Sequence, residues 1–240
     1  VHQLPSRRRR VERRLRRARH RVKVADDRVE PRAARERRGL GGRELVESQR
    51  PHGREVRADA PVGGWAALSG AIILGARTGK YSKTGQVNPM PGSNLPLATL
   101  GTFILWLGWF GFNGGSQLAL GSAIDAAAVA DIFINTNMSA AAGVVAAMIA
   151  TQLLYGKVDL TMALNGAIGG LVSITAEPLA PSIDQALFIG AIGGILVVLA
   201  VPLLDKLKID DVVGAIPAHL VCGIWGTMIV PLSNTGTAYG

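Results

Sequence analysis

The chain has 240 residues, and its formal net charge of +9 is distributed very unevenly along the sequence. Residues 1–60 contain 20 of the 26 Lys and Arg and 9 of the 17 Asp and Glu, whereas residues 61–240 carry a net charge of −2. Such a low charge density over three quarters of the chain is typical of a multi-pass membrane protein and argues against a soluble domain. The single cysteine, Cys222, excludes an internal disulfide and a cysteine-based metal cluster.

Residues 1–60 are rich in arginine and show no sustained apolar period. This composition cannot bury enough apolar surface to fold alone, so we expect a disordered segment. Three interpretations remain open: a solvated tail, a basic arm for anionic lipid or nucleic acid, and a stretch translated from a shifted reading frame. We expect the membrane domain to occupy residues 61–240.

From Val62 onward, six apolar segments have the hydropathy of membrane-spanning helices. The expected fold is therefore an all-α, polytopic membrane helix bundle, located in the cell membrane. The segments are residues 62–78, 96–119, 132–155, 160–178, 185–204 and 212–232.

Basic residues after residue 60 occur only in alternate connections between these segments. The positive-inside rule predicts that these connections are cytoplasmic, so the first span would start outside. The many basic groups of residues 1–60 would then lie on the unfavourable side, which is a physical reason to distrust that segment. The basic residues are Arg77, Lys80 and Lys83 in the first connection, Lys157 in the third, and Lys206 and Lys208 in the fifth.

Two successive spans contain nearly the same small-residue pattern, at residues 166–170 and 190–194. Small residues three or four positions apart allow helix backbones to approach closely in lipid. We therefore expect tight helix packing around these glycines.

His219 is the only histidine after residue 60 and lies about 12 Å along a helix from Asp211. An ionisable group at membrane depth is a candidate functional residue, and the alternative is a histidine hydrogen-bonded between helices. Pro217 should loosen the backbone nearby, while Gly223 and Gly226 keep the surroundings narrow. These features favour a pore-lining position, where a neutral imidazole can pass on a proton or bind a small polar solute.

Trp109 and Phe112 lie three residues apart on one helix face, with Leu105 a turn earlier. They are candidates for an aromatic constriction with a cation–π contribution, or for ordinary aromatic packing at the membrane interface. The polar end of this span, Asn113 to Ser116, is unsuited to lipid and should face a neighbouring helix or a path through the protein.

The acidic residues suggest no catalytic arrangement. Asp210 and Asp211 are expected to be an acidic pair at a helix N-terminus, favoured by the helix dipole. No Ser-His-Asp, metal-ligand or phosphate-loop pattern is present, so we expect no enzyme, no metal and no cofactor. The remaining carboxylates after residue 60 are expected to be solvated: Asp125, Asp131, Asp159, Glu177, Asp184 and Asp205.

Four stretches together resemble the ammonium transporter family (Amt/Mep/Rh): VGGWAALSGAIILG, NPMPGSNLPLATLG, GTFILWLGWFGFNGGS and KIDDVVGAIPAHLVCGIWGT. The resemblance runs from Val62 to Val230 and keeps the order of the segments. It implies part of a trimeric, eleven-span bundle with one pore per subunit, in which these segments are the fifth to tenth spans. The family binds ammonium at an outer vestibule and passes ammonia and the proton inward separately along a pore with two histidines.

Carried over by position, the resemblance implies that His219 is the second pore histidine and Phe112 the inner phenylalanine of the gate. Ser116 corresponds to the vestibule serine that binds ammonium, and the other pore-lining places fall on Trp109, Leu105 and Ala215. The sequence departs from the family pattern at Ala60, where the first pore histidine belongs. Counterparts of the first four spans and of the eleventh are also missing.

The expected function is transport of ammonium or ammonia across the inner or plasma membrane, for nitrogen uptake, by a truncated member that is inactive alone. The resemblance implies a homotrimer and a PII signalling protein as partners, together with membrane lipid. We expect no nucleic acid partner. The alternatives are a membrane anchor whose basic arm binds anionic lipid or nucleic acid, and a multi-span carrier of another solute.

Overall fold

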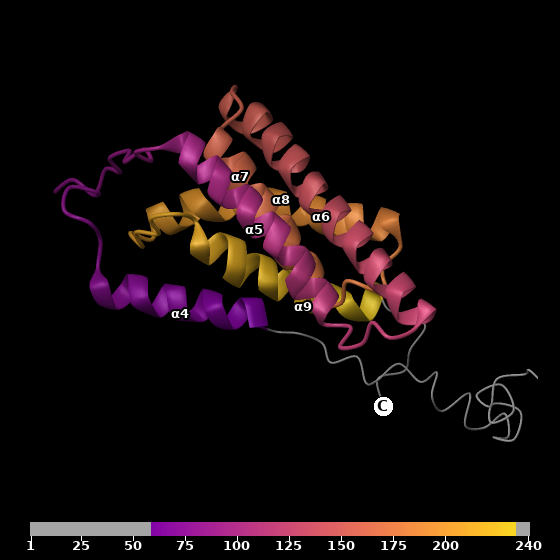
Figure 1. Ribbon diagram of the computed structural model, residues 1–240. Coiled ribbons are helices and arrows are strands. Elements are labelled where there is room, and N and C mark those ends of the chain that lie inside the picture. Colours follow the sequence, from indigo (N-terminus) through magenta and orange to yellow (C-terminus); the bar gives the residue numbers. More distant parts are fainter. Residues whose placement is uncertain (1–58, 234–240) are drawn as a thin grey trace, which may run out of the picture. The chain divides into compact units, whose positions relative to one another are not determined.

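The computed structural model describes residues 59–233, and the expectations for residues 1–58 and 234–240 lie outside this range. The described part is helical, with one isolated bridge between Tyr81 and Val87 as its only strand-like pairing. The helices are α4 (Asp59–Leu74), α5 (Leu95–Gly115), α6 (Ala123–Tyr155), α7 (Leu160–Thr175), α8 (Ile183–Lys206), the π-helical turn η1 (Ile216–Val221) and α9 (Cys222–Ser233) (Figure 1).

Each of the six expected segments overlaps a helix, which confirms the all-α membrane bundle. Within residues 59–233, four helical stretches are long and apolar enough to cross a membrane: α5, α6, α8 and the continuous stretch Ile216–Ser233. Helices α4 and α7 have 16 residues each. They are about 24 Å long, somewhat shorter than the roughly 30 Å hydrocarbon core.

The prediction of a connection between the second and third apolar segments, at residues 120–131, is wrong over most of its length. Helix α6 already begins at Ala123. Ser122 caps the helix by accepting a hydrogen bond from the backbone N–H of Asp125 at 3.1 Å. The following residues are largely alanine, the strongest helix former, and Asp125 in the first turn complements the helix dipole. With 33 residues, α6 extends about 50 Å and exceeds the membrane core.

Glycines hold α6, α7 and α8 close together. A Cβ atom added at Gly190 would clash with the carbonyl oxygen of Ser139, and one added at Gly194 would clash with that of Gly143. The Ser139 hydroxyl donates a hydrogen bond of 2.7 Å to the carbonyl oxygen of Gly170. The small residues seen in the sequence therefore sit where the helix backbones touch.

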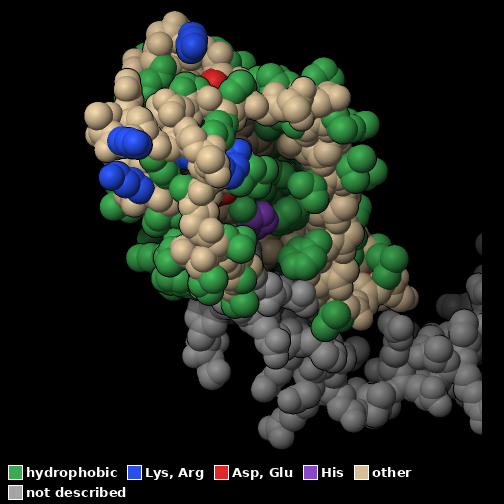
Figure 2. Space-filling model, turned by 90° about the vertical axis from the view of Figure 1, so that its left-hand side faces the viewer, with side chains coloured by type: hydrophobic (Ala, Val, Ile, Leu, Met, Phe, Trp, Pro, Cys, Tyr) green, Lys and Arg blue, Asp and Glu red, His purple; other side chains and the backbone are tan. Residues whose placement is uncertain are grey.

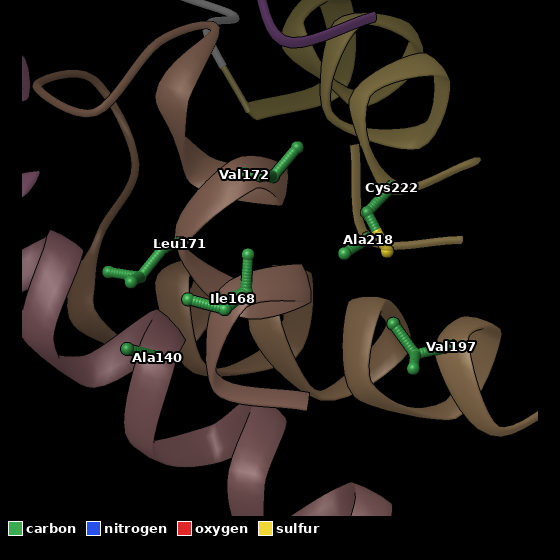
Figure 3. Packing of buried hydrophobic residues seen from close by; sticks show 7 residues of the cluster. All are labelled: Ala140, Ile168, Leu171, Val172, Val197, Ala218 and Cys222. Atoms are coloured by element: carbon green, nitrogen blue, oxygen red, sulfur yellow. The ribbon is translucent and has the colours of Figure 1, made fainter. Parts of the chain in front are cut away.

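The main apolar core lies between these helices and the last span. Helix α7 is buried along its second half, from Gly166 to Thr175. Trp109 of α5 packs against the edge of this core. Figure 3 shows the core cluster, formed by Ala140, Ile168, Leu171, Val172, Val197, Ala218 and Cys222.

Helix α4 runs beside η1 and α9 (Figure 1). Two glycines allow this contact: a Cβ added at Gly64 would clash with the backbone of Leu220, and one added at Gly223 would lie 2.7 Å from Cδ of Pro61. The first and last described spans are thus in direct backbone contact next to His219.

Helix α5 packs against α6 and α7 with one side and leaves its other side uncovered in the described structure. The exposed side chains include Leu97, Leu100, Phe103, Ile104 and Leu107.

Candidate functional site

His219 lies in η1, a turn of π-helix that directly precedes α9. Pro217 has no backbone N–H to donate, which favours a break in the regular hydrogen-bond ladder. The observed π-turn agrees with the loosened backbone that the sequence predicts there. Single π-helical turns within longer helices occur frequently at functional sites.

The imidazole of His219 stacks on the indole of Trp109, with 6.3 Å between ring centroids and 25° between ring planes. The same indole contacts the ring of Phe112 at a centroid distance of 6.0 Å. Trp109 therefore joins the predicted gate phenylalanine and the predicted pore histidine in one row of rings. We call these three residues the aromatic row.

Thr175 fixes the position of the indole. Its hydroxyl oxygen accepts a hydrogen bond of 2.8 Å from Nε1 of Trp109 and donates one of 2.6 Å to the carbonyl oxygen of Leu171. Thr175 is buried at the end of α7. The sequence does not single out this residue, because the contact spans 66 positions and a threonine at a helix end has no distinctive local pattern.

The histidine side chain is partly accessible and faces a hollow on one side of the bundle. Figure 2 shows it in purple, surrounded by hydrophobic side chains. Phe112 is 47% exposed on the same helix as Trp109. An imidazole in such surroundings can donate a hydrogen bond to a small polar molecule or accept one from it.

The other predicted site residues lie on α5, at its end, or just before η1. Ser116 ends α5, and its hydroxyl donates a hydrogen bond of 2.8 Å to the carbonyl oxygen of Phe112. It lies about 10 Å along the helix from Trp109. Leu105 is 53% exposed one turn before Trp109, and Ala215 immediately precedes the π-turn.

Asn113 is almost fully buried between α5 and α6, where its Nδ2 donates a hydrogen bond of 3.0 Å to Oγ1 of Thr136. The amide oxygen Oδ1 has no hydrogen-bond partner among the described residues. Asn113 therefore faces a neighbouring helix, which is one of the two environments that the sequence predicts for the polar end of this span.

An ion pair joins the first and fifth connections at one end of the bundle. Nε and Nη2 of Arg77 each donate a hydrogen bond of 2.8 Å to the carboxylate of Asp210, and the Arg77 backbone N–H donates a third of 2.9 Å. These hydrogen bonds lower the pKa of Asp210 to about 2. Lys80 also pairs with Asp205 at 3.0 Å. Two of the three basic connections therefore meet at one end, as the alternating topology requires.

Several carboxylates differ from the sequence expectations. Asp210 belongs to the ion pair, and only Asp211 caps the last helical stretch, accepting hydrogen bonds from the backbone N–H groups of Ala215 at 3.0 Å and Ile216 at 2.6 Å. Asp205 is paired rather than merely solvated. Glu177 is only 6% exposed, and its carboxylate accepts a 3.2 Å hydrogen bond in its own turn.

The described residues contain no group of three or more His, Cys, Asp or Glu side chains that could hold a metal ion. The chemistry available at the aromatic row is therefore that of one imidazole, flanking π-faces and apolar walls. Such a site suits the passage of a small cation or of its neutral base.

A family model described as Ammonium Transporter Family matches residues 61–238. The chain is 44% identical over 179 residues to ammonium transporter Amt2 of Archaeoglobus fulgidus, covering 75% of this chain and 37% of that protein. It is 43% identical over 180 residues to a putative ammonium transporter of Synechocystis, covering 74% and 40%.

Among solved structures, a sensor Amt protein matches with a TM-score of 0.70 and 40% identity, covering 75% of this chain and 44% of that structure. The chain thus spans about two fifths of the length of these relatives. The shared region includes all of the helices described above except the first two residues of α4.

Proposed function

Because the chain belongs to the ammonium transporter family, we propose that it forms part of a membrane transporter for ammonium or ammonia. The observation that carries this proposal is the aromatic row, in which Trp109 stacks on His219 and contacts Phe112 within an apolar bundle.

Each residue of the site has a distinct proposed role. His219 accepts a hydrogen bond from the permeating species or passes on its proton, since an imidazole can do either near neutral pH. Phe112 restricts access to the row, and Ser116 binds ammonium on the far side of that restriction. Trp109, Leu105 and Ala215 line the pathway.

Further helices are needed to complete the pathway. The apolar side of α5 is uncovered in the described structure, and the hollow beside His219 is open in the view of Figure 2. A pore must be walled on all sides, because lipid or water would otherwise enter it. We infer that the described helices alone do not transport, and that the matched family's remaining spans supply the missing wall.

The family resemblance extends this proposal to partners. We propose a homotrimer and docking of a PII signalling protein at the basic end of the bundle, and we propose that the protein has no enzymatic activity. The alternative of a basic arm for anionic lipid or nucleic acid concerns residues outside the described range, and nothing in the comparisons favours it. A carrier of another solute is equally unsupported by the relatives.

The test is a chimera in which residues 61–238 replace the matched segment of the Archaeoglobus fulgidus relative, so that the relative supplies the remaining spans. Expressed in cells that lack ammonium transport, the chimera should restore growth on limiting ammonium. His219→Ala should abolish this growth, because no other side chain of the row can exchange a proton. Lys83→Gln, at an exposed site outside the row, serves as the control and should grow normally.

Failure of the chimera to support growth, at membrane levels equal to those of the parent relative, would contradict the proposed function. Growth of the His219→Ala chimera at the parent rate would contradict the role given to the histidine. Growth supported by residues 61–240 alone would contradict the inferred need for further helices.

A further inference from the structure

A second hollow, distinct from the one beside His219, lies at the charged end of the bundle. It has a volume of about 350 Å³ and is bounded by the end of α6, the start of α7 and the end of α8. None of the aromatic-row residues lines it. Its lining consists of Tyr155, Met162, Val201 and Pro202, together with the charged residues Lys157, Asp159 and Asp205.

Local backbone structure places the charged groups at this hollow. Gly156 ends α6 with a φ of +74°, a left-handed conformation that favours glycine and turns the chain toward α7. Lys157 follows in the exposed connection, and Asp159 then caps α7 by accepting a hydrogen bond of 3.0 Å from the backbone N–H of Met162. An ammonium group and a carboxylate thus lie two residues apart beside an apolar hollow.

The charged groups beside the hollow differ in whether they already form an ion pair. Asp205 is already paired with Lys80 at 3.0 Å. Lys157 forms no ion pair within the described range of residues 59–233. Burial raises the pKa of Asp159, but hydrogen bonds from Thr161 and Met162 outweigh that effect and lower it, so the carboxylate is ionised at neutral pH. The hollow therefore presents one available cation and one nearby anion.

The position of the hollow indicates what kind of molecule reaches it. It lies where three membrane helices end, and the tyrosine at its edge is a residue type enriched at the membrane–water interface. The neighbouring molecules in this zone are phospholipids, whose chains suit the apolar walls. The volume falls within the range of ordinary small-molecule sites, roughly 300–1,000 Å³.

Charge complementarity selects among phospholipid headgroups. A purely anionic headgroup would benefit from Lys157 but would also face the carboxylates of Asp159 and Asp205. A headgroup with both a phosphate and a primary ammonium matches both signs, and its N–H groups can donate hydrogen bonds to a carboxylate. A choline headgroup has no such donor. We propose that this hollow binds phosphatidylethanolamine, with its phosphate on Lys157 and its ammonium group on Asp159.

Native mass spectrometry of the purified full chain in detergent tests this site. The protein is titrated with phosphatidylethanolamine, phosphatidylcholine and phosphatidylglycerol of identical acyl chains, and an apparent Kd is obtained for the first bound lipid. Phosphatidylethanolamine should bind about fivefold more tightly than phosphatidylcholine, the change expected for one favourable charge interaction at a membrane surface. It should also bind more tightly than phosphatidylglycerol.

Two isosteric variants isolate the charges. Lys157→Gln should remove the contact to phosphate, and Asp159→Asn should remove the contact to the ammonium group while keeping the helix cap, since asparagine caps equally well. Asp159→Asn should reduce the preference over phosphatidylcholine to less than twofold, whereas Lys157→Gln should weaken the binding of both lipids by about fivefold, because both carry the phosphate. Lys83→Gln makes the same change of charge in the exposed first connection and should leave the binding of both lipids unchanged.

A third variant, Met162→Trp, fills the hollow while retaining both charges, and it should weaken binding of phosphatidylethanolamine at least fivefold. Far-UV circular dichroism verifies that each variant retains its helices, and a variant that does not is replaced by Lys157→Met or Asp159→Ser in the same comparison. Equal binding of ethanolamine and choline lipids, tighter binding of phosphatidylglycerol, a preference over phosphatidylcholine that survives Asp159→Asn, or unchanged lipid binding by Lys157→Gln would overturn the proposal. None of these outcomes depends on transport activity.

Discussion

At the scale of single residues, Trp109 organises the candidate site. Its ring contacts both neighbours of the aromatic row, and its N–H donates to Thr175. An indole positioned by two ring contacts and one hydrogen bond keeps a fixed orientation beside His219. Helix α7 therefore holds in place the ring that stacks on His219.

Replacing Thr175 tests this support. Thr175→Val removes the acceptor and leaves a partly buried N–H unpaired, which should lower the free energy of unfolding by about 1–3 kcal/mol. Thr175→Ser retains a hydroxyl acceptor and should lower the free energy of unfolding by a smaller amount. Reversible unfolding in detergent, followed by circular dichroism, measures both values. Equal losses for valine and serine would show that the hydrogen bond does not stabilise the site.

The ion pair of Arg77 with Asp210 predicts a dependence of stability on pH. Because the folded state lowers the pKa of Asp210 from 3.8 to about 2, the pair contributes fully above pH 4 and is lost as the pH falls through 2. The contribution is about 2 kcal/mol. Asp210→Asn should therefore be less stable than the parent chain at pH 6, and the difference should shrink between pH 4 and 2.

Unfolding free energies of the two chains, measured across pH 2–6, check this prediction. Asp131→Asn, at an exposed carboxylate on α6, is the matched control and should track the parent chain over the whole range. A constant difference between Asp210→Asn and the parent from pH 6 to 2 would be inconsistent with the ion pair.

Some site residues could be predicted from the sequence and others could not. His219 stands out because an ionisable side chain in an apolar stretch is rare, whatever its partners. Arg77 and Asp210 are separated by 133 positions, and no local pattern shows that they pair. Glu177 was expected to be solvated, but its burial depends on how the turn after α7 packs, which is a tertiary property.

At the scale of elements, the contact of α6 with α8 depends on glycine. Gly190 faces the Ser139 backbone with no room for a side-chain atom, whereas Gly108 of α5 has nothing within 4 Å of an added Cβ. Replacing glycine by alanine should therefore have opposite effects on stability at the two positions.

Gly190→Ala should force α6 and α8 apart and lower the free energy of unfolding by about 1–3 kcal/mol. Gly108→Ala should leave stability unchanged or raise it by up to about 1 kcal/mol, because alanine is the better helix former. Thermal and denaturant unfolding in detergent compare the two variants. A smaller loss for Gly190→Ala than for Gly108→Ala would contradict the close backbone contact.

The extents of most elements follow from apolar runs and capping residues in the sequence. The exception is α6, whose first turns contain two aspartates that suggest a connection. Alanine propensity and the Ser122 cap outweigh the low hydropathy there, because a helix can extend beyond the membrane core into water. Hydropathy alone marks the limits of the apolar segment, not the limits of the helix.

At the scale of the whole molecule, the basic residues predict orientation. The Arg77–Asp210 and Lys80–Asp205 pairs bring the first and fifth connections to one end, and the positive-inside rule predicts that this end is cytoplasmic. The sequence predicts which connections lie on the same side of the membrane, because this prediction needs only the order of the spans. What covers the exposed side of α5 does not follow from the order of the spans.

Cysteine labelling tests the orientation, since the native Cys222 is fully buried and should not react. Gly121→Cys lies in the second connection and Thr84→Cys in the first, and both positions are exposed. A membrane-impermeant maleimide added to intact cells should label the Gly121→Cys variant, and should label Thr84→Cys only after permeabilisation. The reverse pattern would contradict the predicted orientation.

The central claim is that the aromatic row belongs to an ammonium pathway that further helices complete. The most direct measurement is the initial rate of labelled methylammonium uptake into vesicles containing the purified chimera described above, the same chimera with His219→Ala, or the chain alone. We predict uptake that excess ammonium suppresses for the chimera, at least a tenfold lower rate for His219→Ala, and none above empty vesicles for the chain alone. Uptake by the chimera that is unaffected by ammonium or by the loss of the histidine would contradict the claim.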